Sequence, residues 1–600
     1  MVPFRKGRSW ILLVGPALNN IGARRGREPR AFGTVGVQSQ HPVPVAQVTP
    51  RVLGEGVRLR RLLVACSAAL LAGCSPGPLA AQKHAPVAGP AEGLGTVHFP
   101  TSCGRNVAPE FDRAVALLHS FEFGDAIKAF NAVLASDSSC AMAYWGIALS
   151  RWTNPMAPGG RPLATLQFGR QAAGEATRLA RNATERERGY IGAVSELFDD
   201  YEHVPQPMRV AAYERAMASL SAAEPADTEA KIFHALALVS AAPPTDKTYA
   251  NQLKAGAELE AVWAKQPNHP GLAHYIIHSY DVPALAPRAA AAAERYARIA
   301  PSSAHALHMP SHTFTRVGKW QESVTTNLRS LAAALKESAM AEALHASDYA
   351  VYAYLQMRHD AAAQAVVAGL PALAANFDPT AVTGAAPGSA GVFALAAIPA
   401  RYALERRAWT EAAALQPKAS AFLYPEAVTF FARALGASHL ADTALARASI
   451  DSLAAIRDRL LARGEAYWGE QVAIQYLEAS AWLELAEGQG DAAVARMREA
   501  AVREDATEKS AVTPGPLAPA RELLGDMLLE RKRPAEALEE YRRTMTKEPG
   551  RFRSLYGAMR AAGAAGDRAM RAKYGAELKR LTGSAAFRGG GHGARASDHG

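Results

Sequence analysis

Most of this chain has the apolar periodicity of amphipathic helices. Apolar residues recur every three or four positions, and long runs without proline or glycine, such as 289–300, favour helix nearly throughout. Proline, glycine and polar residues mark the turns between these runs. Among the helices predicted are 111–118, 125–134, 141–152, 182–197, 208–220, 227–239, 392–407, 409–414, 425–435, 440–461, 467–485 and 491–503.

The helices recur in pairs with a period of 34 residues. Pro267 and Pro301 close successive pairs and lie 34 positions apart, as do Lys532 and Gly566 at equivalent turns far downstream. The residues at 318–323, Gly-Lys-Trp-Gln-Glu-Ser, form the expected turn between paired helices. These features resemble the tetratricopeptide repeat, whose helix-turn-helix unit is 34 residues long. The resemblance covers 105–365 and 515–582 and implies an all-α fold, an α-α superhelix or solenoid.

Two short segments carry a narrower resemblance. Residues 140–146 read Cys-Ala-Met-Ala-Tyr-Trp-Gly, and residues 305–312 read His-Ala-Leu-His-Met-Pro-Ser-His. Both are similar to segments of a bacterial family of exported tetratricopeptide proteins. This resemblance implies an architecture and export from the cytoplasm, and it implies no activity.

Breaks in the helical pattern divide the chain. Residues 376–391, with Asp-Pro and Ala-Pro-Gly, predict a loop or lid between an N-terminal array at 101–375 and a C-terminal array at 392–582. A stretch rich in proline, glycine and alanine at 74–100 predicts a flexible tether. The polar, glycine-rich end at 583–600 predicts a disordered tail.

The segment before the tether resembles a bacterial lipoprotein signal peptide at 57–73. Three arginines precede an apolar run at 62–71, which is followed by Leu71-Ala72-Gly73-Cys74. The resemblance implies a lipid on Cys74 and a periplasm-facing place in the cell envelope, at the outer membrane of a Gram-negative cell. Residues 1–56 are then either a misassigned start, with translation beginning at Val57, or a real N-terminal extension.

Charge and cysteine content agree with export. The net charge is +10, but residues 1–73 hold eleven basic and two acidic residues, so the remainder is almost neutral and a nucleic-acid partner is not expected. Cys103 and Cys140 are the cysteines left in the mature body, and we expect a disulfide between them. Two free buried thiols are the alternative.

Histidines are concentrated in the middle of the chain. Seven of the seventeen lie between residues 269 and 345. His274 and His278 are one helical turn apart, and His308 and His312 repeat this pair 34 residues later. The spacing predicts imidazoles on the same face of adjacent first helices, which line the concave groove in tetratricopeptide arrays. The predicted groove residues are Trp145, His274, His278, His305, His308, His312, Arg316, His345, Asp348 and Tyr352.

Clustered neutral imidazoles are good ligands for zinc or copper. The metal hypothesis names six of these residues, with Asp348 as a ligand or as a group that orients an imidazole. The other interpretation is a polar groove for a peptide or small anion, or ordinary hydrogen bonds between repeats. The six predicted metal ligands are His274, His278, His305, His308, His312 and His345.

The sequence favours a binding protein over an enzyme. His274-Tyr-Ile-Ile-His278 lacks the glutamate of a zinc-protease helix, and the chain has no nucleophile elbow or phosphate loop, so we assign no catalytic residue. The first hypothesis is a lipid-anchored scaffold that binds a protein, peptide or small ligand in its groove. The second is a zinc- or copper-binding protein, or a metal-dependent enzyme, centred on residues 274–345.

Overall fold

The protein is all-helical, as the sequence predicts. The computed structural model describes residues 93–586, which belong to one compact unit and contain no β-strand. The predicted extension at 1–56, the signal peptide at 57–73 and the lipidated Cys74 lie outside the described residues, as do residues 587–600. Within the described residues, no helix is both long enough and apolar enough to span a bilayer.

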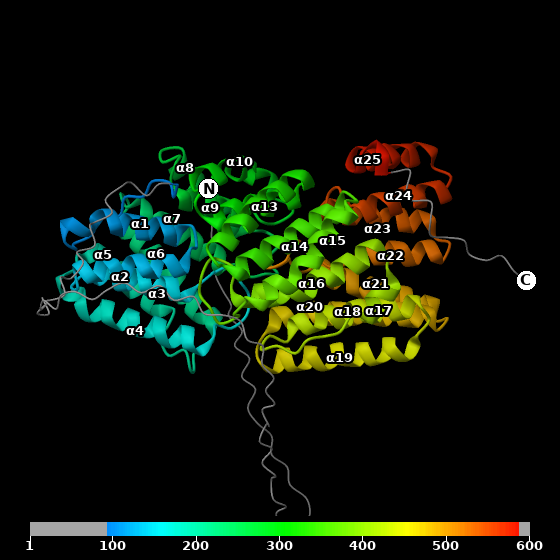
Figure 1. Ribbon diagram of the computed structural model, residues 1–600, viewed down its shortest axis with the longest axis horizontal. Coiled ribbons are helices and arrows are strands. Elements are labelled where there is room, and N and C mark those ends of the chain that lie inside the picture. Colours follow the sequence, from blue (N-terminus) through cyan, green and yellow to red (C-terminus); the bar gives the residue numbers. More distant parts are fainter. Residues whose placement is uncertain (1–92, 587–600) are drawn as a thin grey trace, which may run out of the picture. The chain divides into compact units, whose positions relative to one another are not determined.

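Helical hairpins follow one another along the chain (Figure 1). The α-helices are α1 (Ala108–His119), α2 (Phe123–Ser136), α3 (Ala141–Trp152), α4 (Leu163–Leu179), α5 (Glu185–Glu196), α6 (Gln206–Ala223), α7 (Thr228–Ser240), α8 (Ala250–Trp263), α9 (Pro270–Ser279), α10 (Ala290–Ile299), α11 (Ala304–His308), α12 (Pro310–Arg316), α13 (Trp320–Lys336), α14 (Met340–Gln356), α15 (Asp360–Ala375), α16 (Gly388–Arg406), α17 (Trp409–Ala414), α18 (Tyr424–His439), α19 (Thr443–Ala462), α20 (Ala466–Ala486), α21 (Gly490–Asp505), α22 (Ala520–Glu530), α23 (Pro534–Lys547), α24 (Phe552–Ala564) and α25 (Arg568–Ala586).

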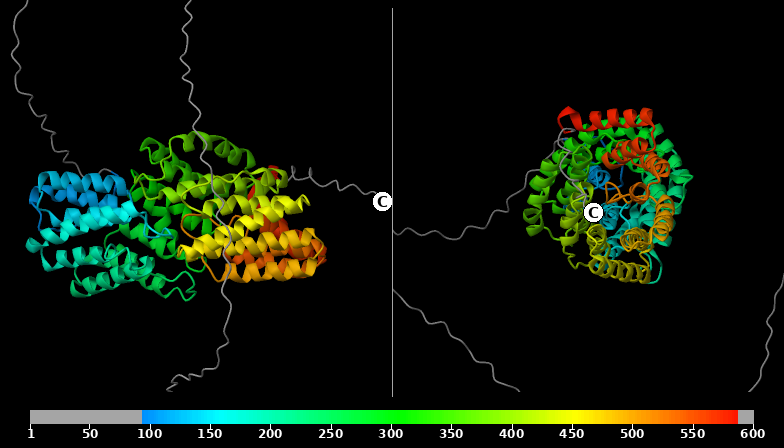
Figure 2. Two further views of the ribbon diagram at one scale, coloured as in Figure 1. Left: turned by 90° about the horizontal axis from the view of Figure 1, so that it is seen from below. Right: turned by 90° about the vertical axis from the view of Figure 1, so that its right-hand side faces the viewer.

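Neighbouring helices pack side by side in the manner of an α-solenoid (Figure 2). Each helix contacts the next in sequence and often the one after it, as α1 contacts both α2 and α3. Small residues allow the helices to pack closely. At Gly146 of α3, for example, a Cβ atom would lie 2.2 Å from Cζ of Phe130 on α2 and would clash with it. The fold is therefore the predicted tetratricopeptide-like solenoid.

The boundaries of the predicted loop and tail differ from those in the structure. Helix α15 ends at Ala375 and α16 begins at Gly388, so residues 388–391 are helical. Helix α25 continues past residue 582 to Ala586, with a non-helical Gly583 near its end. Both predicted boundaries lie at glycines, Gly391 and Gly583, and a glycine alone is a weak marker of a helix end.

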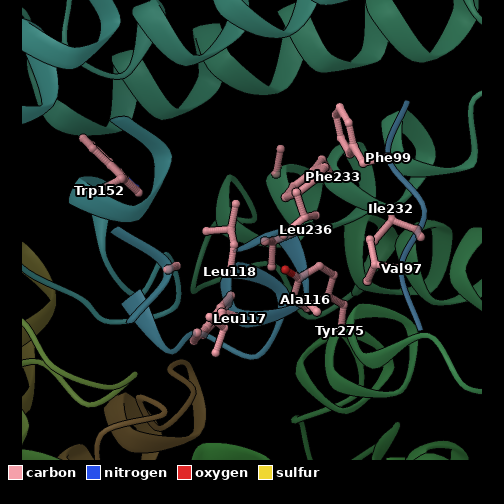
Figure 3. Packing of buried hydrophobic residues seen from close by; sticks show 14 of the residues in the cluster. Val97, Phe99, Ala116, Leu117, Leu118, Trp152, Ile232, Phe233, Leu236 and Tyr275 are labelled. Carbon is pink, nitrogen blue, oxygen red and sulfur yellow. The ribbon is translucent and has the colours of Figure 1, made fainter. Parts of the chain in front are cut away.

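The predicted tether is too long at its C-terminal end. Leu94, Val97 and Phe99 are buried in the N-terminal core, where the Phe99 ring lies 5.3 Å from that of Trp145. Figure 3 shows Val97 and Phe99 on an extended segment close to Ile232. Apolar side chains on an extended segment can be buried as fully as those on a helix. The folded body therefore begins at about residue 93 rather than 101.

The predicted disulfide is present. Cys103 and Cys140 are bonded and close a segment of 37 residues around the first hairpin. Because the bond restricts the unfolded chain, replacing both cysteines with serine is expected to lower the free energy of unfolding by about 2–4 kcal/mol. Urea unfolding of the variant and of the oxidised parent measures the difference. Adding reductant to the parent should reproduce it, and equal stability with and without reductant would contradict the prediction.

His439 at the end of α18 makes the protein sensitive to acid. Its ring stacks on Trp409 and contacts Trp482, and burial lowers its pKa to about 3. The unfolded chain therefore binds a proton below about pH 6.5 that the folded chain does not, and stability falls as the pH drops. His439→Gln is expected to reduce this loss by roughly 1 kcal/mol per pH unit, as measured by urea unfolding between pH 7 and 5. His359→Gln, at an exposed histidine, should leave the acid dependence of the parent.

Candidate metal centre

Four helices bring the six predicted histidines together. His274 and His278 lie one turn apart on α9, whose first turn begins at Pro270. His305 and His308 come from the short helix α11, which ends where Pro310 begins α12 and its His312. His345 comes from α14.

The six side chains form two sets of three. His274, His278 and His305 make the first set, and His308, His312 and His345 make the second. Within each set, one ring nitrogen from every histidine lies within 4.8 Å of those of the other two. We call these the α9 set and the α14 set.

In the α9 set, the Nε2 atoms of three imidazoles converge. The Nε2 atom of His274 lies 3.1 Å from Nε2 of His305 and 3.1 Å from Nε2 of His278. Nδ1 of His274 is 2.7 Å from the backbone oxygen of His119, and Nδ1 of His305 is 3.2 Å from a carboxylate oxygen of Glu342. A carbonyl or carboxylate oxygen accepts, so both Nδ1 atoms carry a proton, and in a neutral imidazole the Nε2 atom then presents a lone pair.

The α14 set has the same arrangement. Nδ1 of His308 donates to Oδ1 of Asn327 at 2.7 Å, and the Asn327 amide donates to the Ser323 backbone oxygen, which fixes the orientation of the amide. Nδ1 of His312 donates to Asp281 at 2.9 Å. The Nε2 atoms of His308 and His312 are again 3.1 Å apart, with lone pairs facing one another.

These lone pairs have the spacing of ligands to one ion. Two nitrogens bound to a tetrahedral zinc ion at about 2.0–2.1 Å are roughly 3.3–3.4 Å apart. Two facing lone pairs without a proton or cation between them repel each other. The carboxylates and the amide behind the imidazoles are the partners that orient metal-bound histidines in proteins.

Burial lowers the pKa values of five of the six histidines. Removal from water, and then the neighbouring imidazoles of His278 and His305, hold the pKa of His274 well below its usual value. For the same reasons, burial first and neighbouring histidines second, the pKa values of His278, His308 and His345 are also far below normal. Neutral imidazole is the form that binds a metal.

The histidines do not line an open groove, which corrects the sequence-based picture. Their exposed fractions range from 0% for His274 and His308 to 6% for His278 and His345. The turn between α1 and α2 covers one side, where the Phe121 ring is 4.4 Å from that of His274 and Glu122 accepts from the His305 backbone. Segments from distant repeats therefore fill the space that the sequence predicts to be a concave groove.

Two longer segments close the remaining sides. Residues 376–387 reach the cluster through Ala386, whose backbone N–H donates to Glu342 at 2.9 Å. Residues 506–519, between α21 and α22, lie against α14, where Tyr349 donates towards the backbone oxygens of Ala511 and Thr513. We call residues 506–519 the strap. Lys509 of the strap pairs with Asp281 at 3.3 Å.

The other predicted groove residues are buried too, but outside the two sets. Arg316 pairs with Asp281. Asp348 pairs with Arg401, and its carboxylate hydrogen bonds to no imidazole among the described residues. Tyr352 hydrogen bonds to Glu548. Trp145 packs among core aromatic rings, including Tyr190 at 5.4 Å, which overturns its assignment to the groove.

A third cluster adjoins the α9 set. Glu229 accepts from Nε2 of His119 and of His269, both at 2.9 Å, and the backbone oxygen of His119 is the group that orients His274. The sequence offered no signal for Glu229, Glu342 or Asp281, because each reaches its histidine from another helical hairpin. Asn327 lies on the second helix of the hairpin that carries His308.

Comparisons with known proteins find structural likeness at low sequence identity. No protein-family model matches the chain, and no curated protein matches it. Solved structures to which it is similar include the human IFIT1 dimer with m7Gppp-AAAA, at 11% identity and a TM-score of 0.32 over 70% of this chain and 87% of that one. Others are the APC/C hetero-tetramer Cut9-Hcn1, at 11% identity and 0.31 over 80% and 87%, and yeast Tom70, at 10% and 0.26 over 80% and 92%.

Proposed function

We propose that this protein binds two transition-metal ions, of the zinc and copper class, in adjacent three-histidine sites inside a helical-repeat scaffold. The α9 set holds one ion and the α14 set holds the other. Each ion takes three neutral nitrogens and keeps a further position for water or another small ligand, as in catalytic rather than structural zinc sites. The export and lipid anchoring that the sequence predicts remain part of the proposal.

One observation carries this proposal: Nε2 atoms of neighbouring histidines lie 3.1 Å apart in both sets, while the Nδ1 atoms of the same rings face oxygen atoms elsewhere. Histidines that served only to bridge packed helices would pair a donor with an acceptor. Here, three of the four other nitrogens donate to groups that can only accept, namely a backbone carbonyl and two carboxylates. A cation between the Nε2 atoms turns mutual repulsion into coordination.

The burial of the predicted groove argues for a metal over a peptide. A peptide needs an accessible surface along several repeats, whereas the six histidines are at most 6% exposed. Imidazole suits zinc, copper, nickel and iron, and carboxylate oxygen suits magnesium, calcium and manganese. The nitrogen-only ligand sets therefore favour the first group, to which zinc and copper belong, over the second.

Zinc titration of protein purified without a histidine tag tests the proposal. After treatment with a chelator at neutral pH, the folded protein should bind two zinc ions per chain, measured by competition with a chromophoric chelator and by elemental analysis. His234→Gln, which changes a buried histidine outside the sets, should still bind two. A parent protein that is folded by circular dichroism and binds neither zinc nor copper would refute the proposal.

A further inference from the structure

We propose that His119, Glu229 and His269 form a third metal site, which takes a divalent ion of the iron and manganese class and opens to solvent through a neighbouring cleft. The site uses none of the six histidines of the α9 and α14 sets, so this inference goes beyond the proposed function and does not depend on it. It draws on the convergence of three side chains, their spacing and chemistry, and the cleft that reaches them.

The three side chains come from separate helical hairpins. His119 is the last residue of α1, Glu229 lies in the first turn of α7, and His269 immediately precedes α9. One nitrogen or oxygen atom from each lies within 4.8 Å of those of the other two. All three residues are buried, with exposed fractions of 0%, 3% and 2%. Segments that are distant in the sequence therefore bring three metal-binding groups to one point.

The atoms of this cluster have the spacing of neighbouring ligands on one ion. Oε2 of Glu229 lies 2.9 Å from Nε2 of His119, and Oε1 of Glu229 lies 2.9 Å from Nε2 of His269. Two ligand atoms that are each about 2.1 Å from an ion and at right angles to one another are roughly 3.0 Å apart. An ion held by both oxygens of Glu229 can therefore bind both Nε2 atoms without a large movement of the side chains.

The hydrogen bonds around the cluster allow this exchange. Without an ion, both Nε2 atoms carry a hydrogen and donate to Glu229. An ion replaces these two hydrogens, and each neutral imidazole then carries its proton on Nδ1. Nδ1 of His119 lies 3.0 Å from the Tyr275 hydroxyl, which can accept as well as donate, and Nδ1 of His269 has no hydrogen-bond partner. Because the ion must replace two hydrogens, this site fills after the α9 and α14 sets.

The ligand types distinguish this site from the two histidine sets. Two imidazoles and one carboxylate, with other positions left open, are the ligands of non-haem iron(II) sites, and carboxylate oxygen also suits manganese. The α9 and α14 sets offer nitrogen only. The third site therefore suits a harder divalent ion than the ions proposed for those two sets.

A polar cleft gives the third site an approach from solvent. The cleft has a volume of about 630 Å³, and its wall includes Glu229 and His269 together with Arg186, Asp227 and Gln266. Among the described residues that line it, none belongs to the α9 or α14 set. An ion at the third site can therefore enter through the cleft and keep water in its open positions, as ions in catalytic sites do.

Manganese titration of zinc-loaded protein tests the inference. Full-length protein without a tag receives two equivalents of zinc and then Mn(II), and paramagnetic resonance measures the free Mn(II). We expect one bound Mn(II) per chain, and faster relaxation of water protons because water on the ion exchanges through the cleft. Glu229→Gln should weaken Mn(II) binding by more than about 10-fold and keep both zinc ions. Glu214→Gln, a matched change at a carboxylate 3.3 Å from His234, should bind Mn(II) like the parent.

The outcomes separate this inference from the proposed function. A parent protein that binds two zinc ions and no Mn(II) would overturn the third site and leave the two histidine sets intact. A parent that binds no zinc, but binds one Mn(II) that Glu229→Gln removes, would support the third site and count against the sets. Unchanged Mn(II) binding in folded Glu229→Gln would place the ion elsewhere and overturn the inference. If circular dichroism shows that this variant is unfolded, His269→Gln replaces it with the same expected result, and the stoichiometry of the parent is decisive in either case.

Discussion

Replacing His308 and His312 together with alanine is expected to lower the metal content from two ions per chain to one. These residues supply two of the three nitrogens of the α14 set, and Nε2 of His345 alone cannot hold an ion against a chelator. Changes to groups behind a ligand weaken metal binding by about 10–100-fold, so the loss of two ligands should exceed 100-fold at this site. Elemental analysis and zinc competition measure both the stoichiometry and the affinity.

Two further variants show that the loss is specific. Asn327→Leu removes the acceptor that orients His308 while keeping all six ligands, and it should weaken zinc binding at one site by about 10–100-fold. His234→Gln should match the parent. If the double alanine variant still binds two ions with parental affinity, the α14 set is not a metal site.

Replacing Arg551 with methionine is expected to lower the free energy of unfolding by about 3–5 kcal/mol. Arg551 is fully buried beside α24, with Glu405 at 2.9 Å and Glu522 at 2.8 Å, and its Nη1 donates to the Tyr352 hydroxyl. Methionine keeps much of the volume and removes the charge. Two buried carboxylates would then lose their main counter-ion, which is the costly way to break such a network. Urea unfolding of the metal-free proteins measures the loss.

An exposed pair provides the control for this variant. Arg533 pairs with Glu536 at 2.7 Å, but the two side chains are 39% and 46% exposed, so Arg533→Met should change stability by less than about 1 kcal/mol. Neutralising the partners, as in Arg551→Met with Glu405→Gln and Glu522→Gln, should recover part of the lost stability. A loss for Arg551→Met no larger than that for Arg533→Met would show that the network is not important for stability.

Local periodicity explains what the sequence could predict. The 34-residue interval between His274 and His308, and between His278 and His312, placed both pairs on equivalent faces of successive first helices. In the structure, the first pair lies in the α9 set and the second pair in the α14 set. Helix α3 was predicted at 141–152, its bounds in the structure, because apolar and small residues alternate there with few interruptions.

Long-range contacts account for the features that the sequence could not predict. Nothing local to Phe121, Glu122 or residues 506–519 indicates that they cover histidines more than 150 positions away. The predicted open groove was therefore wrong about accessibility although right about which histidines meet. Helices α4 and α8 were not predicted, and glycines, Gly169 in α4 and Gly256 in α8, interrupt the helical pattern in both.

The strap bears on how quickly a bound ion is released. The strap reaches the α14 set through Tyr349 and is tied to Asp281 through Lys509, so an ion held by the histidines can leave only after this segment moves. The histidine helices precede the strap along the chain. An ion captured before the strap docks would be retained kinetically, and its exchange would follow the rate of local unfolding rather than the strength of three metal–nitrogen bonds.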